Sequence, residues 1–549
     1  MKTWFKSGSP WIWLSGAAVS LSLIMVVGLV AFIAYKGLGI YWPATLHQYE
    51  LANADGSTDF VVGEIYDTEI VSRERIKDSG VTVAGDEKWI SRMLLKTGNR
   101  DIYGSDFRWI IEKNAIEEQQ PKELVTFVRR EWGNLYGFLD LIKENNVIVS
   151  EKVDWADFEA RLAYAAELHD AIEEIEKHKI GSVNYDLERL RLERRKLEID
   201  NRLDAAATQD LKNREQQLDQ VYQQYQTELA SLYKKIKRDS VSIKIADGRM
   251  VDVHLAQIVR AYKPNAMTVF QKIKFYLESI WLFVSEDPRE ANTEGGIFPA
   301  IFGTVMMVLI MSIIVTPFGI IAAVYLREYA KQDYWTRTIR IAVNNLAGVP
   351  SIVYGIFGLG FFVYFLGGNI DQLFFPEALP APTFGTPGIL WASLTLAILT
   401  LPVVIVATEE GLSRVPKSIR EGSLALGATK WETLRKTVLP MASPAMMTGL
   451  ILAVARAAGE VAPLMLVGVV KLAPSLPLDE NFPFLHLDRK FMHLGFHIYD
   501  VGFQSPNVEA ARPLVYATAL LLIVVIIFLN LAAISIRNRL REKYKGLDH

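Results

Sequence analysis

The chain lacks cysteine and carries almost no net charge, and both facts narrow its chemistry. None of its 549 residues is a cysteine, which excludes disulfide bonds, thiolate metal ligands and cysteine nucleophiles. The formal net charge is −3, which gives no reason to expect nucleic-acid binding. A GxxxxGK[ST] phosphate-binding loop is also missing, so we do not expect this chain to hydrolyse ATP itself.

Apolar residues are abundant and unevenly distributed. They make up 50% of the chain, with a mean hydropathy of +0.17, and they gather towards its two ends. A helix needs about 20 apolar residues to cross a bilayer core of roughly 30 Å. Six segments meet this requirement: Trp11–Tyr35, Ile297–Leu326, Ile341–Leu366, Ile389–Thr408, Pro444–Val470 and Pro513–Ile536. No small-x-small cleavage pattern follows the first, so we expect a retained anchor rather than a signal peptide.

The distribution of lysine and arginine predicts the orientation of these spans. Basic residues cluster after the second and fourth spans and in the C-terminal tail, whereas Gly367–Gly388 has none. This pattern predicts that both termini are cytoplasmic and that residues 40–295 lie outside, in the periplasm if the cell has one. The prediction uses Lys2, Lys6, Arg327, Lys331, Arg337, Arg340, Arg414, Lys417, Arg420, Lys430, Arg435, Lys436, Arg537, Arg539, Arg541, Lys543 and Lys545.

The polar insert between the first two spans shows two kinds of pattern. Residues 157–238 are rich in Glu, Lys, Arg, Gln and Leu, with apolar positions seven residues apart at Leu211, Leu218, Tyr225 and Leu232. We expect an antiparallel helical hairpin, or coiled-coil arm, turning near Ala205–Thr208; a single helix that dimerises is the alternative. Phe60–Ile70 is typical of a strand, and Asp247-Gly248 predicts a hairpin between Val241–Ala246 and Arg249–Leu255.

The segment Glu409–Pro440 is unusual for a connector between two spans. It is longer than an ordinary helix–helix connection and has helical periodicity around Leu424 and Leu434. A glycine at position 427 can end one helix, so the pattern predicts two short helices beneath the membrane.

Four residues of this segment have a diagnostic spacing: Glu421, Gly427, Leu439 and Pro440. They resemble the motif of importer permeases of the ABC class, which reads EAA, three residues, G, nine residues, I, any residue, LP. The chain departs from it at Gly422, Ser423 and Thr437, where the family prefers alanine, alanine and isoleucine. In that family the segment is the coupling helix that docks into the ATPase subunit. The resemblance assigns this role to Arg420, Glu421, Gly427, Leu439 and Pro440.

Three further stretches narrow the resemblance. They are GVPSIVYGIFGLG at Gly348–Gly360, SIREGSLALGATKW at Ser418–Trp431 and MTGLILAVARAAGEVAPLM at Met447–Met465. They resemble the A-type permease subunits (PstA) of Pst high-affinity phosphate importers, over about residues 304–538. The insert at 40–295 is absent from ordinary members of that family.

The resemblance implies an all-α membrane permease whose last five spans form the transport core; the patterns of residues 40–295 add an α+β insert to it. The expected parts are an anchor at 1–39, the insert at 40–295, a core at 296–540 with a coupling loop at 409–440, and a tail at 541–549. It further implies a bacterial inner-membrane location and three partners: a second permease subunit, an ATPase dimer and a periplasmic phosphate-binding protein. No cofactor is expected on this chain, because ATP and Mg²⁺ would be bound by the ATPase.

Arg456 and Glu460 are charged residues inside the predicted fifth span. Arginine at mid-membrane costs about 2.5–3.5 kcal/mol on insertion scales, so its presence needs a reason. Four residues apart, the two side chains share a helix face and can pair. Either the pair only neutralises charge within the bundle, or Arg456 offers its forked donors to an oxyanion in transit while Glu460 holds it in place. Asn344, Asn345 and Ser351, in the predicted third span, are expected to add neutral donors or to bond between helices.

Histidines 486, 493 and 497 cluster in the last predicted outside loop, with Asp488 and Asp500 nearby. Interfacial histidines on an amphipathic segment are expected here, and no metal site.

Two other functions fit parts of the sequence. The first is a permease for sulfate, molybdate or another oxyanion, because an Arg–Glu pair does not choose among oxyanions. The second is a membrane sensor with a periplasmic coiled coil, which would need a substantial cytoplasmic signalling domain; this chain has only a short tail.

Overall fold

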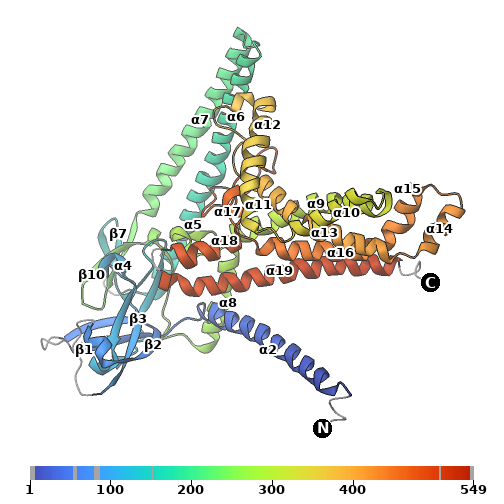
Figure 1. The fold of residues 1–549 in the computed structure, drawn as a ribbon. Helices are drawn as coiled ribbons and strands as arrows, with labels where there is room; N and C mark the ends of the chain where they lie inside the picture. Colours follow the sequence, from blue (N-terminus) through green and yellow to red (C-terminus); the bar gives the residue numbers. More distant parts are fainter. Residues whose placement is uncertain (1–6, 53–57, 79–86, 151–152, 506–507, 545–549) are drawn as a thin grey trace. The chain divides into compact units, whose positions relative to one another are not determined.

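The computed structural model describes residues 7–52, 58–78, 87–150, 153–505 and 508–544 (Figure 1). Of the basic residues behind the orientation prediction, Lys2, Lys6 and Lys545 lie outside these ranges. The chain divides into two compact units. A helical unit comprises residues 1–40, 284–287 and 291–549, and an insert unit comprises residues 41–283 and 288–290.

The helical unit is built from one N-terminal helix and a C-terminal series. Its elements are α2 (Ser9–Gly39), α9 (Phe298–Val324), η5 (Tyr325–Tyr329), α10 (Tyr334–Leu346), α11 (Ser351–Phe357), η6 (Gly358–Gly367), α12 (Gly368–Phe374), η7 (Pro376–Ala378), α13 (Ile389–Arg414), α14 (Lys417–Ala425), α15 (Lys430–Thr433), η8 (Leu434–Val438), α16 (Leu439–Gly459), α17 (Leu464–Val467), α18 (Leu494–Tyr499), η9 (Asp500–Gln504) and α19 (Val508–Tyr544). Here η5, η6, η8 and η9 are π-helical segments that continue a neighbouring α-helix.

Within the described residues, six helices are long and apolar enough to cross a membrane, as the sequence predicts. They are Trp11–Gly39, Phe298–Tyr329, Ser351–Phe374, Ile389–Arg414, Lys430–Gly459 and Val508–Glu542.

Two of the predicted spans have the wrong bounds. The third begins at Ser351 rather than Ile341, because a turn at Gly348–Pro350 separates it from α10. Pro350 disfavours helical backbone at the residue before it. The fifth runs from Lys430 to Gly459 rather than from Pro444 to Val470. Pro444 lies inside α16 instead of starting it, and Glu460 adopts extended backbone that ends the helix.

The core of the helical unit lies between α9, α13 and α16. Met307, Met311 and Leu396 are fully buried there, and small residues let the helices approach closely. A Cβ added to Gly449 would lie 2.6 Å from the Cβ of Ala407, which only glycine avoids. α13 is the central helix of this unit, since two thirds of its most apolar window is buried.

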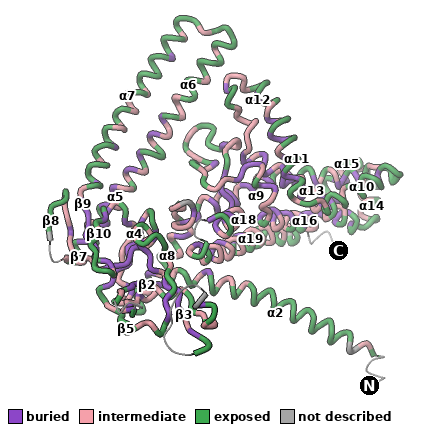
Figure 2. Tube along the Cα trace, turned by 60° about the vertical axis from the view of Figure 1, so that its left-hand side comes forward, coloured by how far each residue is buried: buried purple, intermediate pink, exposed green. Residues whose placement is uncertain are grey.

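α2 is the most exposed of the six candidate spans. None of its most apolar window is buried (Figure 2), and its contact with the rest of the unit is confined to its C-terminal end. There Phe32 packs edge-on against Tyr516 of α19, with ring centroids 5.9 Å apart. An apolar helix that exposes most of its surface suits a lipid environment.

The insert unit contains two antiparallel sheets and a helical arm. Its elements are β1 (Leu46–Ala52), β2 (Thr58–Ser72), α3 (Arg73–Asp78), β3 (Trp89–Lys96), α4 (Arg100–Tyr103), β4 (Phe107–Ile111), η1 (Glu112–Asn114), β5 (Ala115–Gln119), β6 (Val125–Arg129), β7 (Asn134–Glu144), β8 (Val147–Ser150), α5 (Trp155–Glu173), η2 (Glu174–Ile180), α6 (Gly181–Ile199), α7 (Ala205–Ile236), β9 (Asp239–Lys244), β10 (Met250–His254), η3 (Leu255–Gln257), β11 (Ile258–Tyr262) and α8 (Val269–Ser285). The short strands β12 (Pro288–Arg289) and β13 (Glu294–Gly295), with η4 (Glu290–Asn292) between them, follow where the chain passes back to the helical unit.

The sheets confirm both strand predictions. Strand order is β4-β3-β2-β1-β5 in one sheet and β10-β9-β7-β6-β11 in the other, with β8 paired to β7. Phe60–Ile70 lies within β2, and β9 and β10 form the predicted hairpin, with Gly248 at φ +85° in its turn. Phe158 and Leu162 of α5 close the core of the second sheet.

The arm is a helical hairpin, which excludes the single continuous helix. α5, η2 and α6 run out as one rod, and α7 returns beside it (Figure 1). Their shared core includes Ile172 and Ile175 against Leu229 and Ile236. The turn lies at residues 200–204, earlier than predicted, because Asp204 caps α7 by accepting a hydrogen bond from Ala207 N at 2.7 Å. Coiled-coil packing of the arm stays a prediction.

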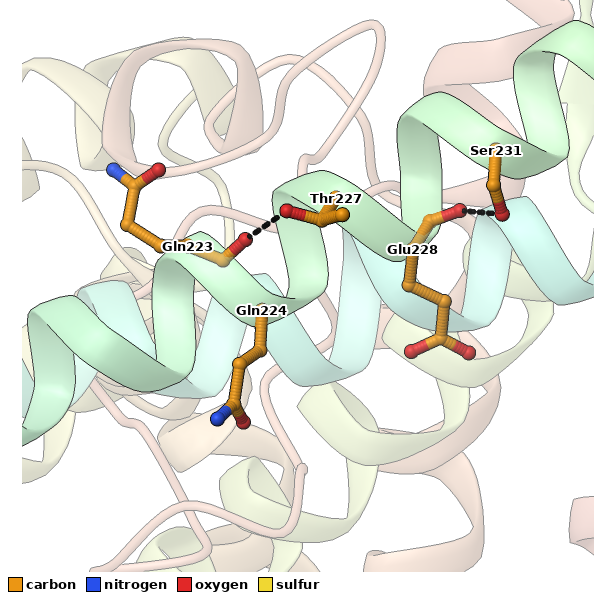
Figure 3. Close-up of a pocket in the computed structure, with 5 residues that line it drawn as sticks. All are labelled: Gln223, Gln224, Thr227, Glu228 and Ser231. Carbon is orange, nitrogen blue, oxygen red and sulfur yellow. Dashed lines mark hydrogen bonds between the residues drawn. The ribbon is translucent and has the colours of Figure 1, made fainter.

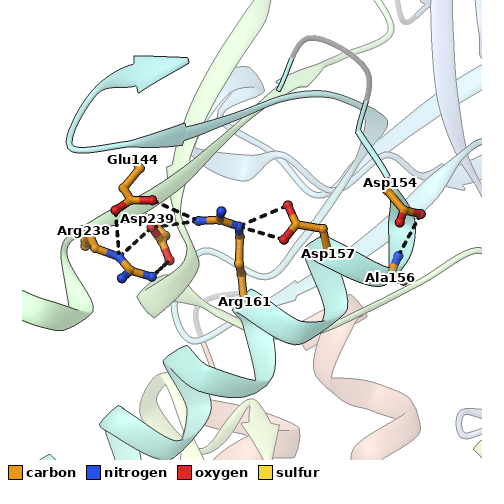
Figure 4. A network of polar contacts seen from close by, with 7 residues as sticks. All are labelled: Glu144, Asp154, Ala156, Asp157, Arg161, Arg238 and Asp239. Atoms are coloured by element: carbon orange, nitrogen blue, oxygen red, sulfur yellow. Dashed lines mark hydrogen bonds and ion pairs between the residues drawn. The ribbon is translucent and has the colours of Figure 1, made fainter. Parts of the chain in front are cut away.

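A network of charges secures the base of this arm (Figure 4). Arg161 of α5 lies 3.2 Å from Asp157, 3.4 Å from Glu144 of β7 and 3.4 Å from Asp239 of β9. Arg238, at the end of α7, donates to Asp239 at 2.7 Å. The carboxylate of Asp239 is almost fully buried, so two guanidinium groups compensate its desolvation.

Candidate functional site

The segment between α13 and α16 contains one short helix, α14, followed by a tight turn, as predicted; the second predicted short helix, α15, is instead the first turn of the helix that continues through η8 into α16. α14 ends before Gly427, whose backbone has φ +89° and whose N–H donates to Leu424 O at 2.9 Å. Glycine is favoured there because L-residues with a side chain rarely adopt such a φ. α15 then starts with a capping box, in which Thr429 and Glu432 bond each other's backbone N–H.

Arg420 and Lys430 attach this segment to the end of the helix formed by α9 and η5. Arg420 Nη2 donates to Leu412 O at 2.5 Å and lies 3.1 Å from Glu328 Oε1. Lys430 Nζ donates to Glu328 O and lies 4.5 Å from the centroid of the Tyr329 ring. α14 and α15 are therefore held to the end of this helix by direct contacts.

A second ion pair lies at the same end of the helical unit. Arg340 of α10 has Nη2 3.4 Å from Glu409 Oε1 of α13, and its Nη1 donates to Gln332 Oε1 at 3.3 Å. Sequence reasoning missed Glu328 and Glu409 as partners. Each glutamate lies dozens of residues from its arginine in the sequence, so no local spacing predicts the contact.

The opposite face of this segment is exposed and partly apolar. Leu426 is 91% exposed, and Leu424 and Trp431 are about half exposed. Glu421 is exposed as well, whereas Leu439, next to Pro440 at the start of α16, packs against the cluster of Leu434 and Val438. The residues assigned to coupling therefore divide into an outward group and an inward group. Such an exposed apolar face is typical of a contact surface.

Arg456 and Glu460 form an ion pair at a helix end rather than at mid-helix. Arg456 Nε lies 3.5 Å from Glu460 Oε1, and the two side chains are 32% and 21% exposed. α16 ends at Gly459, so Glu460 stands just beyond it in extended backbone. The sequence predicts Arg456 at the middle of the fifth span, and the helix bounds contradict this. Arg456 instead lies in the last turn, where a cation also interacts favourably with the helix dipole.

Tyr354 is a neighbour of this pair that sequence reasoning missed. Its hydroxyl lies within electrostatic range of Arg456 and donates to Leu346 O at 2.6 Å. The adjacent Gly355 packs against Pro463, because a Cβ there would lie 2.7 Å from the proline Cα. The GVPSIVYG stretch and the ARAAGEVAP stretch, far apart in sequence, thus meet at Gly355 and Pro463.

Asn344, Asn345 and Ser351 are not placed as predicted. Asn344 and Asn345 lie on the separate helix α10, outside the third span, and both are exposed. Ser351 is the first residue of α11 and is partly exposed. None of the three side chains forms a hydrogen bond with another described residue.

The three histidines are buried, so the expectation of interfacial histidines is wrong. His486 pairs with Asp479 at 2.9 Å, and His493 Nδ1 caps α18 by accepting from Gly495 N at 3.1 Å. His497 Nδ1 lies 3.4 Å from Thr518 Oγ1, while Asp500 pairs with Lys471 at 3.0 Å. Burial lowers the pKa of His493 to about 3. Across the described residues, no set of three or more His, Asp or Glu side chains is arranged to hold a metal ion.

The hollow on the arm drawn in Figure 3 carries no convergent chemistry. Its lining residues, Gln223, Gln224, Thr227, Glu228 and Ser231, all come from α7. Thr227 and Ser231 use their hydroxyls on carbonyls of their own helix, at 2.8 and 2.7 Å. A single helix face without opposing groups does not enclose a ligand.

Comparison with known proteins identifies the helical unit. The family described as "Binding-protein-dependent transport system inner membrane component" matches residues 315–542. The probable ABC transporter permease YqgH of Bacillus subtilis is 32% identical over 195 residues, which cover 35% of this chain and 59% of that protein. The phosphate transport system permease protein PstA 1 of Mycobacterium tuberculosis is 35% identical over 244 residues, which cover 44% of this chain and 71% of that protein.

Among solved structures, the inward-facing MetNI methionine ABC transporter covers 48% of this chain and 98% of its own matched chain. The two are 18% identical, with a TM-score of 0.34. The family match lies entirely in the helical unit and leaves residues 41–283 unmatched. By its C-terminal half, this chain belongs to the family of binding-protein-dependent transport system inner membrane components, the ABC-importer permeases that include PstA.

Proposed function

We propose that the chain is a permease subunit of an ATP-driven importer and that inorganic phosphate is its substrate. One observation carries this proposal: the 35% identity to a phosphate permease, PstA 1, over 244 residues. The residues around Arg456 fall within the matched family region. Phosphate is a tetrahedral oxyanion, and a guanidinium fork suits its recognition.

In this proposal α14 and α15 couple the permease to ATP hydrolysis in a partner. The exposed face of Leu424, Leu426 and Trp431 supplies an apolar contact surface for the ATPase. The ion pair between Arg420 and Glu328 passes motion of that surface to α9. ATP and Mg²⁺ are bound by the ATPase dimer, and this chain has no enzymatic role.

Arg456 is proposed to meet phosphate during transport. Its pairing distance to Glu460 is 3.5 Å, at the outer edge of an ion pair, and a third of its side chain is exposed. A guanidinium held this loosely has donors to offer an incoming anion. Glu460 positions it, and the negative charge of Glu460 prevents phosphate from binding too tightly to be released. Asn344, Asn345 and Ser351 remain proposed neutral donors for a state in which the helices have moved.

The proposed location is the bacterial inner membrane, with both termini in the cytoplasm and the insert outside. The basic residues of the segments after the second and fourth candidate spans support it. Reporter fusions at Asp210 and Gly385 should report outside, and fusions at Lys430 should report inside. A cytoplasmic signal at Asp210 would overturn the orientation. The proposed partners are a second permease subunit, the ATPase dimer and a phosphate-binding protein.

Uptake into vesicles tests the substrate. Sealed vesicles that contain the reconstituted importer, its binding protein and internal ATP should accumulate labelled phosphate. Vesicles lacking this chain should not. Unlabelled sulfate or molybdate in excess should leave phosphate uptake unchanged. Uptake of labelled sulfate or molybdate in place of phosphate would assign a different oxyanion. If the vesicles take up no oxyanion, whether or not ATP is present, the result would favour a sensor instead.

A further inference from the structure

The helix α8 (Val269–Ser285) has one apolar face that is buried in the insert unit and a second apolar face that is largely exposed. Phe275, Ser279 and Phe283, four residues apart, are buried. Phe275 packs against Tyr262 with ring centroids 4.3 Å apart, and Arg260 lies over the Phe275 ring and donates to Ser279 Oγ at 3.0 Å. This face holds α8 on the unit.

The opposite face is a stripe of large, exposed apolar side chains. Phe270 is 85% exposed, Leu277 61% and Trp281 69%, and Ile273 lies between them. Positions 270, 273, 277 and 281 follow helical spacing and fall on one side of the helix. Lys274 and Glu278 flank the stripe and pair at 3.6 Å. Four such residues on one exposed face are costly in water, since each apolar side chain gains when it leaves water.

Chain connectivity keeps the C-terminal end of α8 close to two candidate spans. Tyr41 contacts Phe283 with ring centroids 5.3 Å apart, and Tyr41 follows the end of the first span, Gly39, by two residues. Three residues after Phe283, Glu286 O accepts a hydrogen bond from Phe298 N, the first residue of the second span, at 3.1 Å. Phe283 is therefore connected to each of the two span ends by no more than a few residues of chain and one contact.

Aromatic residues also lie beside α8. Trp42 contacts Tyr276 of α8 with ring centroids 5.9 Å apart. Tryptophan and tyrosine concentrate where a membrane meets water, and short helices with one apolar face and flanking lysines lie in that plane. α8 itself is not among the candidate spans, because it has only 17 residues and these include Lys272, Lys274 and Glu278.

We propose that the stripe of Phe270, Ile273, Leu277 and Trp281 lies in the phospholipid bilayer, at the headgroup–acyl boundary of the leaflet where α2 ends and α9 begins. α8 then fixes the base of the insert to the membrane surface, independently of the substrate that the permease carries.

The absence of cysteine provides a clean test. A single Leu277→Cys substitution in the full-length chain, labelled with an NBD fluorophore, reports the surroundings of the stripe. Gln224→Cys, on an exposed face of α7, is the matched control. Both proteins are reconstituted into vesicles of phosphatidylethanolamine and phosphatidylglycerol, with and without phosphatidylcholine that carries a doxyl group near its headgroup. Aqueous iodide is the second quencher.

Membrane contact predicts that doxyl lipid quenches the label at position 277 several-fold more than the label at 224, and that iodide quenches it several-fold less. Quenching by iodide equal to that of the control would overturn the proposal, because the stripe would then face water. Protection from iodide without quenching by doxyl lipid would also overturn it, since a protein surface would then cover the stripe. In a second variant, Ile273→Cys with Phe270→Ser and Trp281→Ser, quenching by doxyl lipid should fall towards the control.

Discussion

Two ion pairs, one in each unit, have the same local geometry and very different surroundings. In the arm, Arg194 Nε lies 3.5 Å from Glu198 Oε1; in the helical unit, Arg456 Nε lies 3.5 Å from Glu460 Oε1. Both pairs are four residues apart. The arm pair lies towards the exposed tip of α6, whereas the second pair closes the end of an apolar helix beside Tyr354. The sequence spacing of an ion pair and the distance between its charged atoms therefore say little about its role. The surroundings of the pair decide that role.

The same contrast extends to the two units as wholes. The insert carries many paired charges, both in networks such as that of Arg161 and Asp239 and as exposed pairs along the arm. Exposed pairs contribute about 0–1 kcal/mol each. In the helical unit, the charged pairs concentrate at helix ends and in loops, as at Arg340–Glu409, Arg420–Glu328 and Arg456–Glu460. In an apolar unit a charge needs a specific reason, which makes these pairs the better functional candidates.

The most severe test of this contrast removes both charges from each pair. We expect Arg456→Gln with Glu460→Gln to lower phosphate uptake by about 100-fold, the scale on which the loss of one preorganised oxyanion donor slows an enzyme. Arg194→Gln with Glu198→Gln should leave uptake unchanged. Initial uptake rates at matched membrane abundance measure both. Arg456→Lys should retain impaired uptake, because lysine keeps the charge and loses the fork.

Restored uptake in the Arg456/Glu460 double variant would reduce this pair to a neutral structural element. Replacing a buried pair by uncharged groups is often tolerated, so a folded, ATPase-binding but inactive protein is the informative result.

Two glycines sharpen the comparison within the coupling segment. A Cβ added to either Gly422 or Gly427 meets no atom within 4 Å, so crowding does not distinguish them. Only Gly427 has positive φ, at +89°. Gly427→Leu should strain the turn by about 1–2 kcal/mol, displace α14, and uncouple ATP hydrolysis from uptake in an inserted protein. Gly422→Leu should hydrolyse ATP and transport in normal proportion. Equal behaviour of the two variants would remove the turn as the coupling element.

Two deletions test whether the arm is separable from the insert. Removing residues 157–238 takes Phe158 and Leu162 from the core of the second sheet, at a cost of roughly 3–5 kcal/mol for each large side chain. Removing only residues 194–213 spares that core, and the new ends are held by Arg214 and Glu193, 3.1 Å apart. The shorter deletion should keep the insert resistant to protease and the longer one should not, with both proteins inserted. Weaker co-purification of the binding protein with either would give the arm a docking role.

Sequence patterns predicted the features that depend on local order. Hydropathy predicted six apolar helices, the Asp247-Gly248 pair predicted the β9–β10 hairpin, and the glycine at position 427 predicted the turn that ends α14. Each follows from neighbouring residues. The bounds of the third and fifth spans failed, since hydropathy does not see the break at Pro350 or the helical backbone that passes through Pro444.

What sequence could not predict were contacts between distant segments. Tyr354 beside Arg456, Glu328 beside Arg420 and Thr518 beside His497 all depend on how helices pack. The histidines illustrate the consequence. Their spacing indicated an interfacial segment, yet His493 and His497 are buried by helices that precede and follow them in the chain.

The smallest expected effect is a dependence of stability on pH, and it separates the buried histidines of the helical unit from an exposed histidine of the arm. Burial lowers the pKa of His493 to about 3. Burial is also the main cause that lowers the pKa of His497 to about 4. Lys471 lowers the pKa of His497 further, whereas Asp500 and a backbone hydrogen bond with Asn292 raise it. In the unfolded chain both titrate near 6.5. Below pH 6.5 the unfolded chain therefore binds protons that the folded chain does not bind, and stability falls by up to about 1.4 kcal/mol per pH unit per histidine until the folded pKa is reached.

His493→Asn keeps an acceptor for Gly495 N and does not titrate, so its unfolding free energy should fall less steeply between pH 6.5 and 4. His178→Gln, at an exposed position of the arm, should leave the slope unchanged. Unfolding by denaturant in detergent at a series of pH values measures the slopes. An unchanged slope in His493→Asn would mean that His493 is protonated in the folded protein.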